Sequence, residues 1–335
     1  TLRINAVYES LISEVDRFEG SVISFSGDAI TCWFDAKVNE SSLRAVWCAQ
    51  AMQAAMQRFP DLSVKVTVST GPVRRFASGD PEIRLIDVLA GAAVARLAAA
   101  EHLAKSGEII VDQATMTLLQ LTARESRSVE TGELFFVLDP ALIGSERTAA
   151  HPVVPPAVPL DVNLLKAWVL PVVYDREAVG QGLFLTDLRP TVALFVRFIG
   201  IDYDSDPQAK EKLDSIIAQA QRILQRHGGV LLELTIGDKG SYFYASFGST
   251  QVHEDDARRA VKVALELRSK TDLPLQMGIT QGVMRVGAYG GQTRKTFSAL
   301  GDDVNLAARL MTTAFAGEIL LSGNAYQAVA NEFSF

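Results

Sequence analysis

The sequence predicts an α+β fold built from two copies of a ferredoxin-like domain, in which helices pack on an antiparallel sheet. The first observation behind this prediction is an internal repeat, because the dipeptide Gly27–Asp28 recurs 210 residues later as Gly237–Asp238. An offset that stays constant over the length of a domain indicates a duplication. Two further pairs of glycines keep nearly the same spacing, at 211 and 210 residues: Gly71 with Gly282, and Gly107 with Gly317.

The second observation is the pattern around each Gly-Asp dipeptide, which lies between two runs of alternating apolar and polar residues and so predicts a β-hairpin. Helical periodicity flanks both hairpins. The predicted helices are Leu2–Phe18 and Ser42–Arg58 in the first copy, and Gln208–His227 and Glu254–Ser269 in the second. The second copy also opens on a strand, Thr191–Ile199, and we expect the matching strand of the first copy to lie upstream of Thr1.

The predicted domain boundaries follow from a segment rich in proline and small residues. The first domain spans residues 1–138, a linker with a helical lead-in spans 139–187, and the second domain spans 188–335. We expect the lead-in to contain a helix over Val162–Asp175 and a second short one before Leu188. The glycine-rich stretch Gly287–Thr296 lacks the glycine that precedes lysine in a P-loop, and is predicted to be a hairpin tip.

Net charge, the length of the apolar runs and the number of cysteines argue against several classes of protein. The net charge of −7 disfavours a nucleic-acid partner, and no apolar run is long enough to span a membrane. The two cysteines, Cys32 and Cys48, are too few for a disulfide framework, so we expect a cytoplasmic protein.

A polar pair interrupts the apolar helix predicted within Ser298–Met311. Asn305 and Arg309 are four residues apart and therefore share one helical face. An arginine in this setting suits phosphate oxygens. The alternative is that Arg309 caps a neighbouring loop or pairs with a surface carboxylate.

Three segments carry a resemblance to a known family: FSGDAITCWF, GDKGSYFYASFG and ALGDDVNLAARLM. With them the chain resembles the class III nucleotidyl cyclases, most closely the tandem soluble adenylyl cyclases. The resemblance covers nearly the whole chain, including the lead-in LTDLRPTVALFV. It implies that the two domains pair head to tail as an intramolecular pseudo-heterodimer. It also implies one composite site between them that converts ATP to cyclic AMP and pyrophosphate.

The resemblance assigns roles to individual residues. Asp28 would be one of two aspartates that hold two Mg²⁺ or Mn²⁺ ions, and the other is expected on the strand upstream of Thr1. Arg309 would stabilise charge on the phosphorus undergoing attack, and Asn305 would orient the ribose. Lys65 falls where the subfamily has a lysine for the terminal phosphates, although a solvated strand residue is an equal alternative.

The residues that would read the base are less typical of the family. The expected positions hold Leu234, or Glu233 one residue earlier, and Ser298 beside Ala299. A serine hydroxyl both donates and accepts hydrogen bonds, so it does not select a base. Strict alternation along the strand would place Glu233 and Leu234 on opposite faces. ATP is favoured over GTP by the subfamily resemblance alone.

The second interdomain site is expected to be vestigial. Arg197 falls at or beside the family's metal-aspartate position, and Asp202 and Asp204 are expected in the loop that follows. The matching helix of the first copy has Arg96, with Ala92 or Ala93 in place of asparagine. We therefore expect a vestigial pocket near Arg96, Arg197, Asp238 and Ser24. Ser24 replaces a lysine of the subfamily's bicarbonate site, which argues against strong bicarbonate regulation.

Two classes of function follow from these residues. The first is an active cyclase that works as a single chain, within a larger protein that carries further domains. The second is a degenerate module that senses a nucleotide or an anion.

Overall fold

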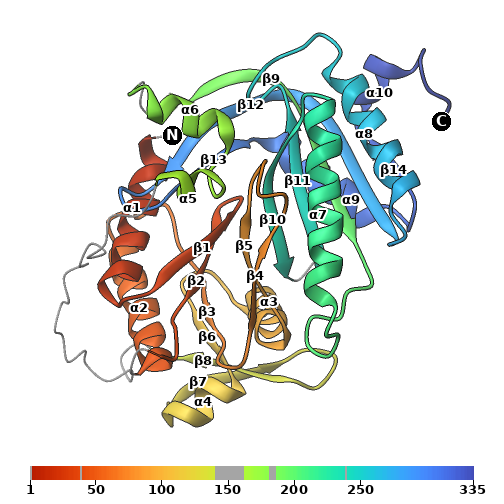
Figure 1. Ribbon diagram of the computed structural model, residues 1–335. Helices are drawn as coiled ribbons and strands as arrows, with labels where there is room; N and C mark the ends of the chain where they lie inside the picture. The colour runs from red at the N-terminus through yellow and green to blue at the C-terminus, as the bar shows by residue number, and fades with distance from the viewer. Residues whose placement is uncertain (1, 38–39, 140–161, 181–185, 238–239) are drawn as a thin grey trace. The chain divides into compact units, whose positions relative to one another are not determined.

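The computed structural model describes residues 2–37, 40–139, 162–180, 186–237 and 240–335 (Figure 1). The chain divides into two compact units. Unit 1 combines residues 1–74, 89–159 and 290–295, and unit 2 combines residues 75–88, 160–289 and 296–335. Each unit therefore includes a short segment from the other half of the sequence.

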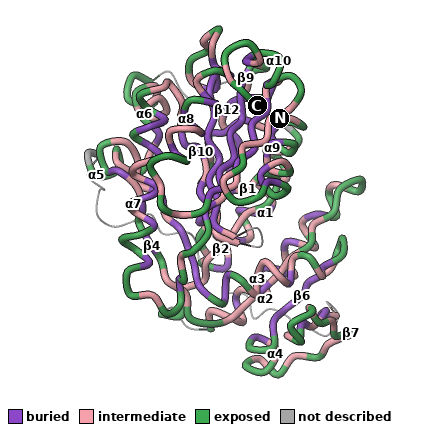
Figure 2. The backbone as a smooth tube through the Cα atoms, turned by 90° about the vertical axis from the view of Figure 1, so that its right-hand side faces the viewer, coloured by how far each residue is buried: buried purple, intermediate pink, exposed green. Residues whose placement is uncertain are grey.

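Unit 2 is built on one mixed sheet with the strand order β10–β11–β9–β12–β13, and β14 pairs with β12. Strand β9 lies in the middle, antiparallel to both β11 and β12, and most of its residues are buried (Figure 2). The strands are β9 (Asp187–Phe198), β10 (Val230–Gly237), β11 (Gly240–Phe247), β12 (Leu275–Gly290), β13 (Lys295–Leu300) and β14 (Ile319–Leu321).

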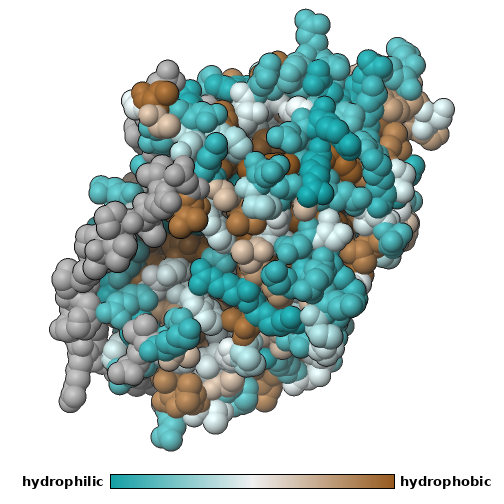
Figure 3. Space-filling model, viewed as in Figure 1, coloured by the Kyte–Doolittle hydropathy of each residue, from teal (hydrophilic) through white to brown (hydrophobic). Residues whose placement is uncertain are grey.

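Helices α7 (Ala209–Arg226), α8 (Asp256–Lys270) and α9 (Asp302–Thr313) pack against this sheet with their buried faces. Helix α7 buries residues at helical spacing, among them Leu213, Ile217 and Leu224, and turns its charged residues to solvent (Figure 3). The remaining helices of unit 2 are α5 (Val162–Lys166), α6 (Pro171–Ala178) and α10 (Gly323–Val329).

Unit 1 shares with unit 2 the order helix, two-stranded hairpin, helix and strand, but its sheet is divided. Strands β1 (Ser21–Ser26) and β2 (Ala29–Trp33) form a two-stranded sheet, whereas β3 (Val66–Val68) belongs to a separate sheet with the order β3–β6–β8–β7. The strands of this second sheet are β3, β6 (Ile109–Asp112), β7 (Ala123–Ser128) and β8 (Leu134–Leu138). Strands β4 (Arg74–Ser78) and β5 (Ile86–Ala90) pair with each other, and most of their residues fall in the segment 75–88 of unit 2. The helices are α1 (Leu2–Arg17), α2 (Ser41–Met56), α3 (Ala92–Leu103) and α4 (Gln113–Leu119).

Most of the predicted elements are confirmed. The four helices that flank the Gly-Asp hairpins appear as α1, α2, α7 and α8, and the stretch Gly287–Thr296 spans the turn from β12 to β13. The prediction of one helix over Val162–Asp175 was wrong, because the chain forms α5 and α6 with a break at residues 167–170. Pro171 explains the break, since proline fits the first turn of a helix but not its interior.

Three further expectations concern a second short helix in the linker, membrane spans and the cysteines. Between α6 and Leu188 the described residues form no further helix, and residues 181–185, where the short helix expected before Leu188 would also fit, lie outside them. None of the described helices is long and apolar enough to cross a membrane. Both cysteines are free.

Candidate active site

The Gly-Asp hairpin of unit 1 presents a carboxylate at its tip. Ser26 pairs with Ala29, so Gly27 and Asp28 form a two-residue turn, and Gly27 has the positive φ of 59° that this turn requires. The Tyr8 hydroxyl donates a hydrogen bond of 2.9 Å to the Gly27 carbonyl oxygen and fixes the turn from helix α1. Asp28 is exposed at this position. A carboxylate held on a short turn suits a hard cation such as Mg²⁺.

The metal site is incomplete in the part of the chain that the structure describes. Within those residues no cluster of three or more histidine, cysteine, aspartate or glutamate side chains is placed to hold a metal ion. The role of Asp28 as a metal ligand, like the rest of the coordination shell, stays a prediction.

Helix α9 separates its apolar and polar residues as the sequence predicts. Val304, Ala307 and Met311 are buried in the core of unit 2, whereas Asn305 and Arg309 are exposed on another face of the helix. Within the described parts of the chain, neither polar side chain has a hydrogen-bond or ion-pair partner. Both remain available to a ligand, and the alternative that Arg309 pairs with a surface carboxylate finds no support among these residues.

The register of the second Gly-Asp hairpin determines which residue of β10 meets Ser298. The pairing of β10 with β11 is regular from Gly237 back to Glu233, and Leu232 is an extra residue in the ladder just before this stretch. Glu233 lies opposite Tyr244, and the Ser298 hydroxyl donates a hydrogen bond of 2.8 Å to Glu233 Oε1. Of the two base-reading candidates on this strand, Glu233 joins Ser298.

Leu234 and Ala299 offer little to a ligand. Leu234 is 3% exposed and lies opposite Phe243, one position after the residue that contacts Ser298. The Ala299 side chain is fully buried in the core of unit 2, and its carbonyl oxygen accepts a long hydrogen bond of 3.4 Å from the Tyr244 hydroxyl.

Burial raises the pKa of Glu233 to about 7, and the hydrogen bond from Ser298 and the charge of Arg84 only partly offset this effect. Arg84 was not identified from the sequence. It lies in the connection between β4 and β5, and its Nη1 donates to the carbonyl oxygens of Leu231 and Leu232 at 3.4 and 3.1 Å. Its guanidinium thereby ties this connection to the bulge.

The raised pKa makes the stability of the protein depend on pH. Glu233 binds its proton more tightly in the folded state, so its contribution to the free energy of unfolding falls as the pH rises through about 7. The Glu233→Gln side chain stays neutral at every pH. We therefore expect the free energy of unfolding of this variant, relative to that of the parent, to be higher at pH 8 than at pH 5, by at most about 3 kcal/mol. Urea unfolding at the two pH values measures the difference. Equal differences at both pH values would contradict the expectation.

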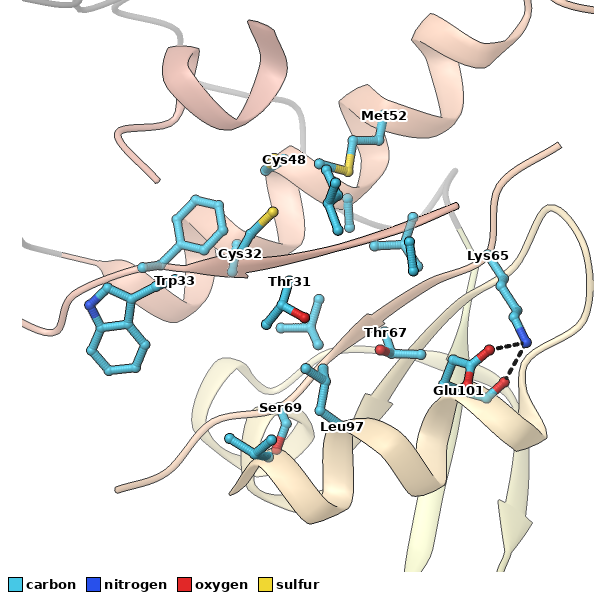
Figure 4. A pocket seen from close by; sticks show the side chains of 18 of the residues that line it. Thr31, Cys32, Trp33, Cys48, Met52, Lys65, Thr67, Ser69, Leu97 and Glu101 are labelled. Carbon is cyan, nitrogen blue, oxygen red and sulfur yellow. Dashed lines mark hydrogen bonds and ion pairs between the residues drawn. The ribbon is translucent and has the colours of Figure 1, made fainter. Parts of the chain in front are cut away.

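Lys65 is engaged by its own unit. Its Nζ lies 2.5 Å from Glu101 Oε1 and donates to the Glu101 carbonyl oxygen at 2.9 Å, as the dashed lines in Figure 4 show. A triphosphate would have to compete with this half-exposed pair. The assignment of Lys65 to the terminal phosphates stays a prediction.

Arg96 holds a buried carboxylate. Its Nε lies 2.8 Å from Asp112 Oδ2, and its Nη2 donates to the Thr70 carbonyl oxygen at 3.0 Å. Burial by itself would raise the pKa of Asp112, but hydrogen bonds from Thr115, Ser69 and Arg96 lower it overall. This network joins α3 to the start of α4.

The register of α3 corrects the interpretation of its residues. Helices α3 and α9 both follow a glycine, Gly91 or Gly301, which are 210 residues apart, and both run for 12 residues. Arg96 therefore corresponds to Leu306, not to Arg309. The counterparts of Asn305 and Arg309 are Ala95 and Ala99, so the expectation that Ala92 or Ala93 replaces the asparagine was also wrong.

The network around Asp112 predicts a large effect on stability. Arg96→Ala leaves the 1%-exposed Asp112 side chain without its guanidinium, and we expect a loss of about 3 kcal/mol in the free energy of unfolding. Lys210→Ala breaks an exposed i,i+4 pair with Asp214 and serves as control, with an expected loss under about 0.5 kcal/mol. Denaturant unfolding of both variants compares the two losses. Similar losses would contradict the structural role of Arg96.

The other residues of the expected vestigial pocket belong to different units, and that they form one pocket stays a prediction. Arg197 Nη1 donates to Gln276 Oε1 at 3.0 Å within unit 2. Ser24 is half-buried on β1 opposite Thr31, and Asp238 lies outside the described residues. Asp202 accepts hydrogen bonds from the backbone of residues 204 and 205, so the loop predicted after β9 is confirmed.

The chain is similar in sequence to a known protein family and to known proteins. Residues 195–335 match the family described as adenylate and guanylate cyclase catalytic domain. Adenylate cyclase type 10 of Rattus norvegicus is 20% identical over 350 residues, which cover 92% of this chain and 21% of the relative. The Homo sapiens protein of the same name is 20% identical over 347 residues, with the same coverage. The chain spans about a fifth of the length of these curated relatives.

Solved structures also resemble part of the chain. The adenylyl cyclase CyaB from P. aeruginosa is 24% identical, with a TM-score of 0.41, over 45% of this chain and 85% of that one. The guanylate cyclase domain of RhGC from Catenaria anguillulae, solved in complex with GTP, is 24% identical, with a TM-score of 0.39, over 44% of this chain and 85% of that one.

Proposed function

We propose that the chain is an adenylyl cyclase, on the premise that residues 195–335 match the family described as adenylate and guanylate cyclase catalytic domain. The proposed reaction is attack of the ribose 3′ hydroxyl of ATP on the α-phosphorus, with pyrophosphate as leaving group. Adenylate cyclases type 10 are 20% identical to this chain over 92% of its length, and this similarity favours ATP as the substrate. We also propose that both copies contribute to one composite site, as the class III resemblance implies.

The observation that carries the proposal is the exposed pair on α9. Asn305 and Arg309 lie on one exposed helical face, and neither has a partner among the residues that the structure describes. A fixed guanidinium stabilises the negative charge that grows on the phosphoryl oxygens during in-line displacement. The Asn305 amide can hydrogen-bond the ribose and hold the attacking hydroxyl in place.

Asp28 supplies the first of the proposed metal ligands. Divalent cations bound at this carboxylate, Mg²⁺ or Mn²⁺, would lower the pKa of the attacking hydroxyl and neutralise charge on the phosphates. The hairpin fixes the position of the Asp28 carboxylate, because the hydrogen bond from Tyr8 holds the turn that carries this residue.

A specific observation favours guanylyl cyclase activity as a second candidate. Glu233 accepts a hydrogen bond from Ser298, and a carboxylate at this place suits the N1–H and amino donors of guanine. Adenine presents one amino donor and a ring-nitrogen acceptor on the same edge, which fits the carboxylate only when Glu233 is protonated.

The test is turnover with ATP and with GTP, each in Mg²⁺ and Mn²⁺, with the cyclic product identified by mass. Cyclic AMP as the main product supports the first candidate, and cyclic GMP supports the second. Folded protein that binds nucleotide and forms neither product would contradict both and support a sensing module.

A further inference from the structure

Strand β12 lies directly under helix α9 in unit 2. Three of its residues, Gly278, Thr280 and Gly282, alternate along the strand and face the helix. Gly278 has a strand on each side, because it pairs with Phe195 of β9 and with Leu320 of β14. Two of the three residues under the helix are thus glycines, and the helix can approach the strand closely there.

The contact at Gly278 is made between backbones. A Cβ atom added to this glycine would lie 2.2 Å from the carbonyl oxygen of Ala307 and 2.6 Å from the amide nitrogen of Met311. These two backbone groups close one i→i+4 hydrogen bond of the helix, and the turn between them carries Arg309. Any side chain at position 278 would therefore push this turn away from the sheet, until the first distance had grown to an ordinary contact of about 3.4 Å.

A hydrogen bond from the same face of β12 holds the first turn of α9. The Thr280 side chain is buried, and its hydroxyl donates a hydrogen bond of 2.8 Å to the carbonyl oxygen of Asp303. Asp303 lies in the first turn of the helix. Gly278 thus sets how close the helix lies to the sheet, and Thr280 fixes the position of the helix along the strand.

Unit 1 has a different arrangement at the corresponding positions. A shift of 211 residues places Thr67 at the position of Gly278, so a β-branched side chain replaces the glycine. The same shift places Ser69 at the position of Thr280, but the Ser69 hydroxyl donates its proton to Asp112 Oδ2 at 2.7 Å and cannot also donate to helix α3. The close backbone contact is therefore found in the copy whose helix carries the polar pair.

We propose that Gly278 and Thr280 are positioning residues for Asn305 and Arg309. The proposal rests on the proposed function, in which this pair orients the ribose and stabilises charge on the phosphorus. Both side chains project from the exposed face of α9, so the position of the helix backbone decides what they can reach. A misplacement of about 1 Å can lower the rate of a reaction by about 10²-fold. The two residues of β12 touch no substrate and act through the helix.

Gly278→Ala tests the close approach of the helix. We expect kcat to fall by about 10²-fold and KM to rise much less, because a displaced Arg309 stabilises the transition state poorly. Gly282→Ala is the matched control on the same face of β12. Its added Cβ would meet only the carboxylate of Asp303, which can turn away, so we expect its turnover to stay within about threefold of the parent. An unchanged kcat in Gly278→Ala with normal circular dichroism would overturn the proposal.

A double-mutant cycle separates positioning from a general loss of structure. In the Arg309→Ala background, Gly278→Ala should lower kcat by less than about fivefold, because the guanidinium that it positions has been removed. A loss of about 10²-fold in this background as well would indicate a purely structural effect and overturn the proposal. An unchanged rate in Arg309→Ala alone would instead refute the proposed function, and the two failures are thereby distinguished.

Thr280→Val decides the question if Gly278→Ala does not fold. Valine has nearly the shape of threonine but lacks the hydroxyl that bonds to the Asp303 carbonyl oxygen. We expect kcat to fall by about fivefold in the parent and by less than about twofold in the Arg309→Ala background. A parent-like kcat in folded Thr280→Val, or an equal loss in both backgrounds, would contradict the positioning role.

Discussion

Arg309→Ala is expected to lower the turnover of the cyclase reaction by a factor of about 10³, with the fold intact. The guanidinium lies on the exposed face of α9. In the proposed mechanism it acts only when charge grows on the phosphoryl oxygens, so its removal should lower kcat more than it raises KM. The side chain makes no contact that the core requires, because the buried face of the helix consists of Val304, Ala307 and Met311. Initial rates of cyclic nucleotide formation at saturating substrate measure the loss.

Two companion variants make this result specific. Arg226→Ala removes an arginine that is exposed on α7 and paired with Glu266, and we expect its turnover to stay within about twofold of the parent. Arg309→Lys keeps the charge but loses the planar fork of donors, so it should recover only part of the rate. A rate unchanged in Arg309→Ala, with normal circular dichroism, would refute the assignment of this residue.

Asp28→Asn is expected to lower metal-dependent turnover by a factor of about 10² or more, because an amide oxygen binds a divalent cation far more weakly than a carboxylate does. The substitution keeps the size of the side chain on the exposed turn, so the melting temperature should change little. Rates over a wide range of Mg²⁺ and Mn²⁺ concentrations distinguish weak metal binding from a lost chemical step. Partial recovery at high metal concentration is the expected pattern.

The repeat offers a matched control for this prediction. Asp238 holds the equivalent place in the second Gly-Asp dipeptide, and we expect Asp238→Asn to leave turnover within about threefold of the parent. If Asp238→Asn were the more damaging of the two, the active and vestigial sites would have been assigned in reverse.

Much of the fold could be predicted from the sequence, because local signals and global pattern agree in this chain. Gly27 and Asp28 define a turn by themselves, and the periodicity of α7 alone shows which face is buried. The exposed pair Asn305 and Arg309 could likewise be placed on one face by spacing alone. These features depend on residues that are close together in the sequence.

What could not be predicted depends on partners that are distant in sequence. Nothing near Arg96 indicates that Asp112 would bind it, 16 residues later and across a strand. Arg84 meets Leu231 and Leu232 across nearly 150 residues, a contact that no local pattern can reveal.

The single extra residue at Leu232 has a consequence for how this strand is compared with other sequences. From Glu233 to Gly237 the pairing of β10 with β11 is regular, so alternation counted back from the Gly-Asp dipeptide assigns each of these side chains to its correct face. Before Leu232 the alternation is shifted by one residue. An ungapped comparison that assigns Val230 and Leu231 to a face by strict alternation would therefore place their side chains on the wrong side of the sheet. The hydrogen-bond register of the hairpin should be established before this part of the strand is compared between proteins.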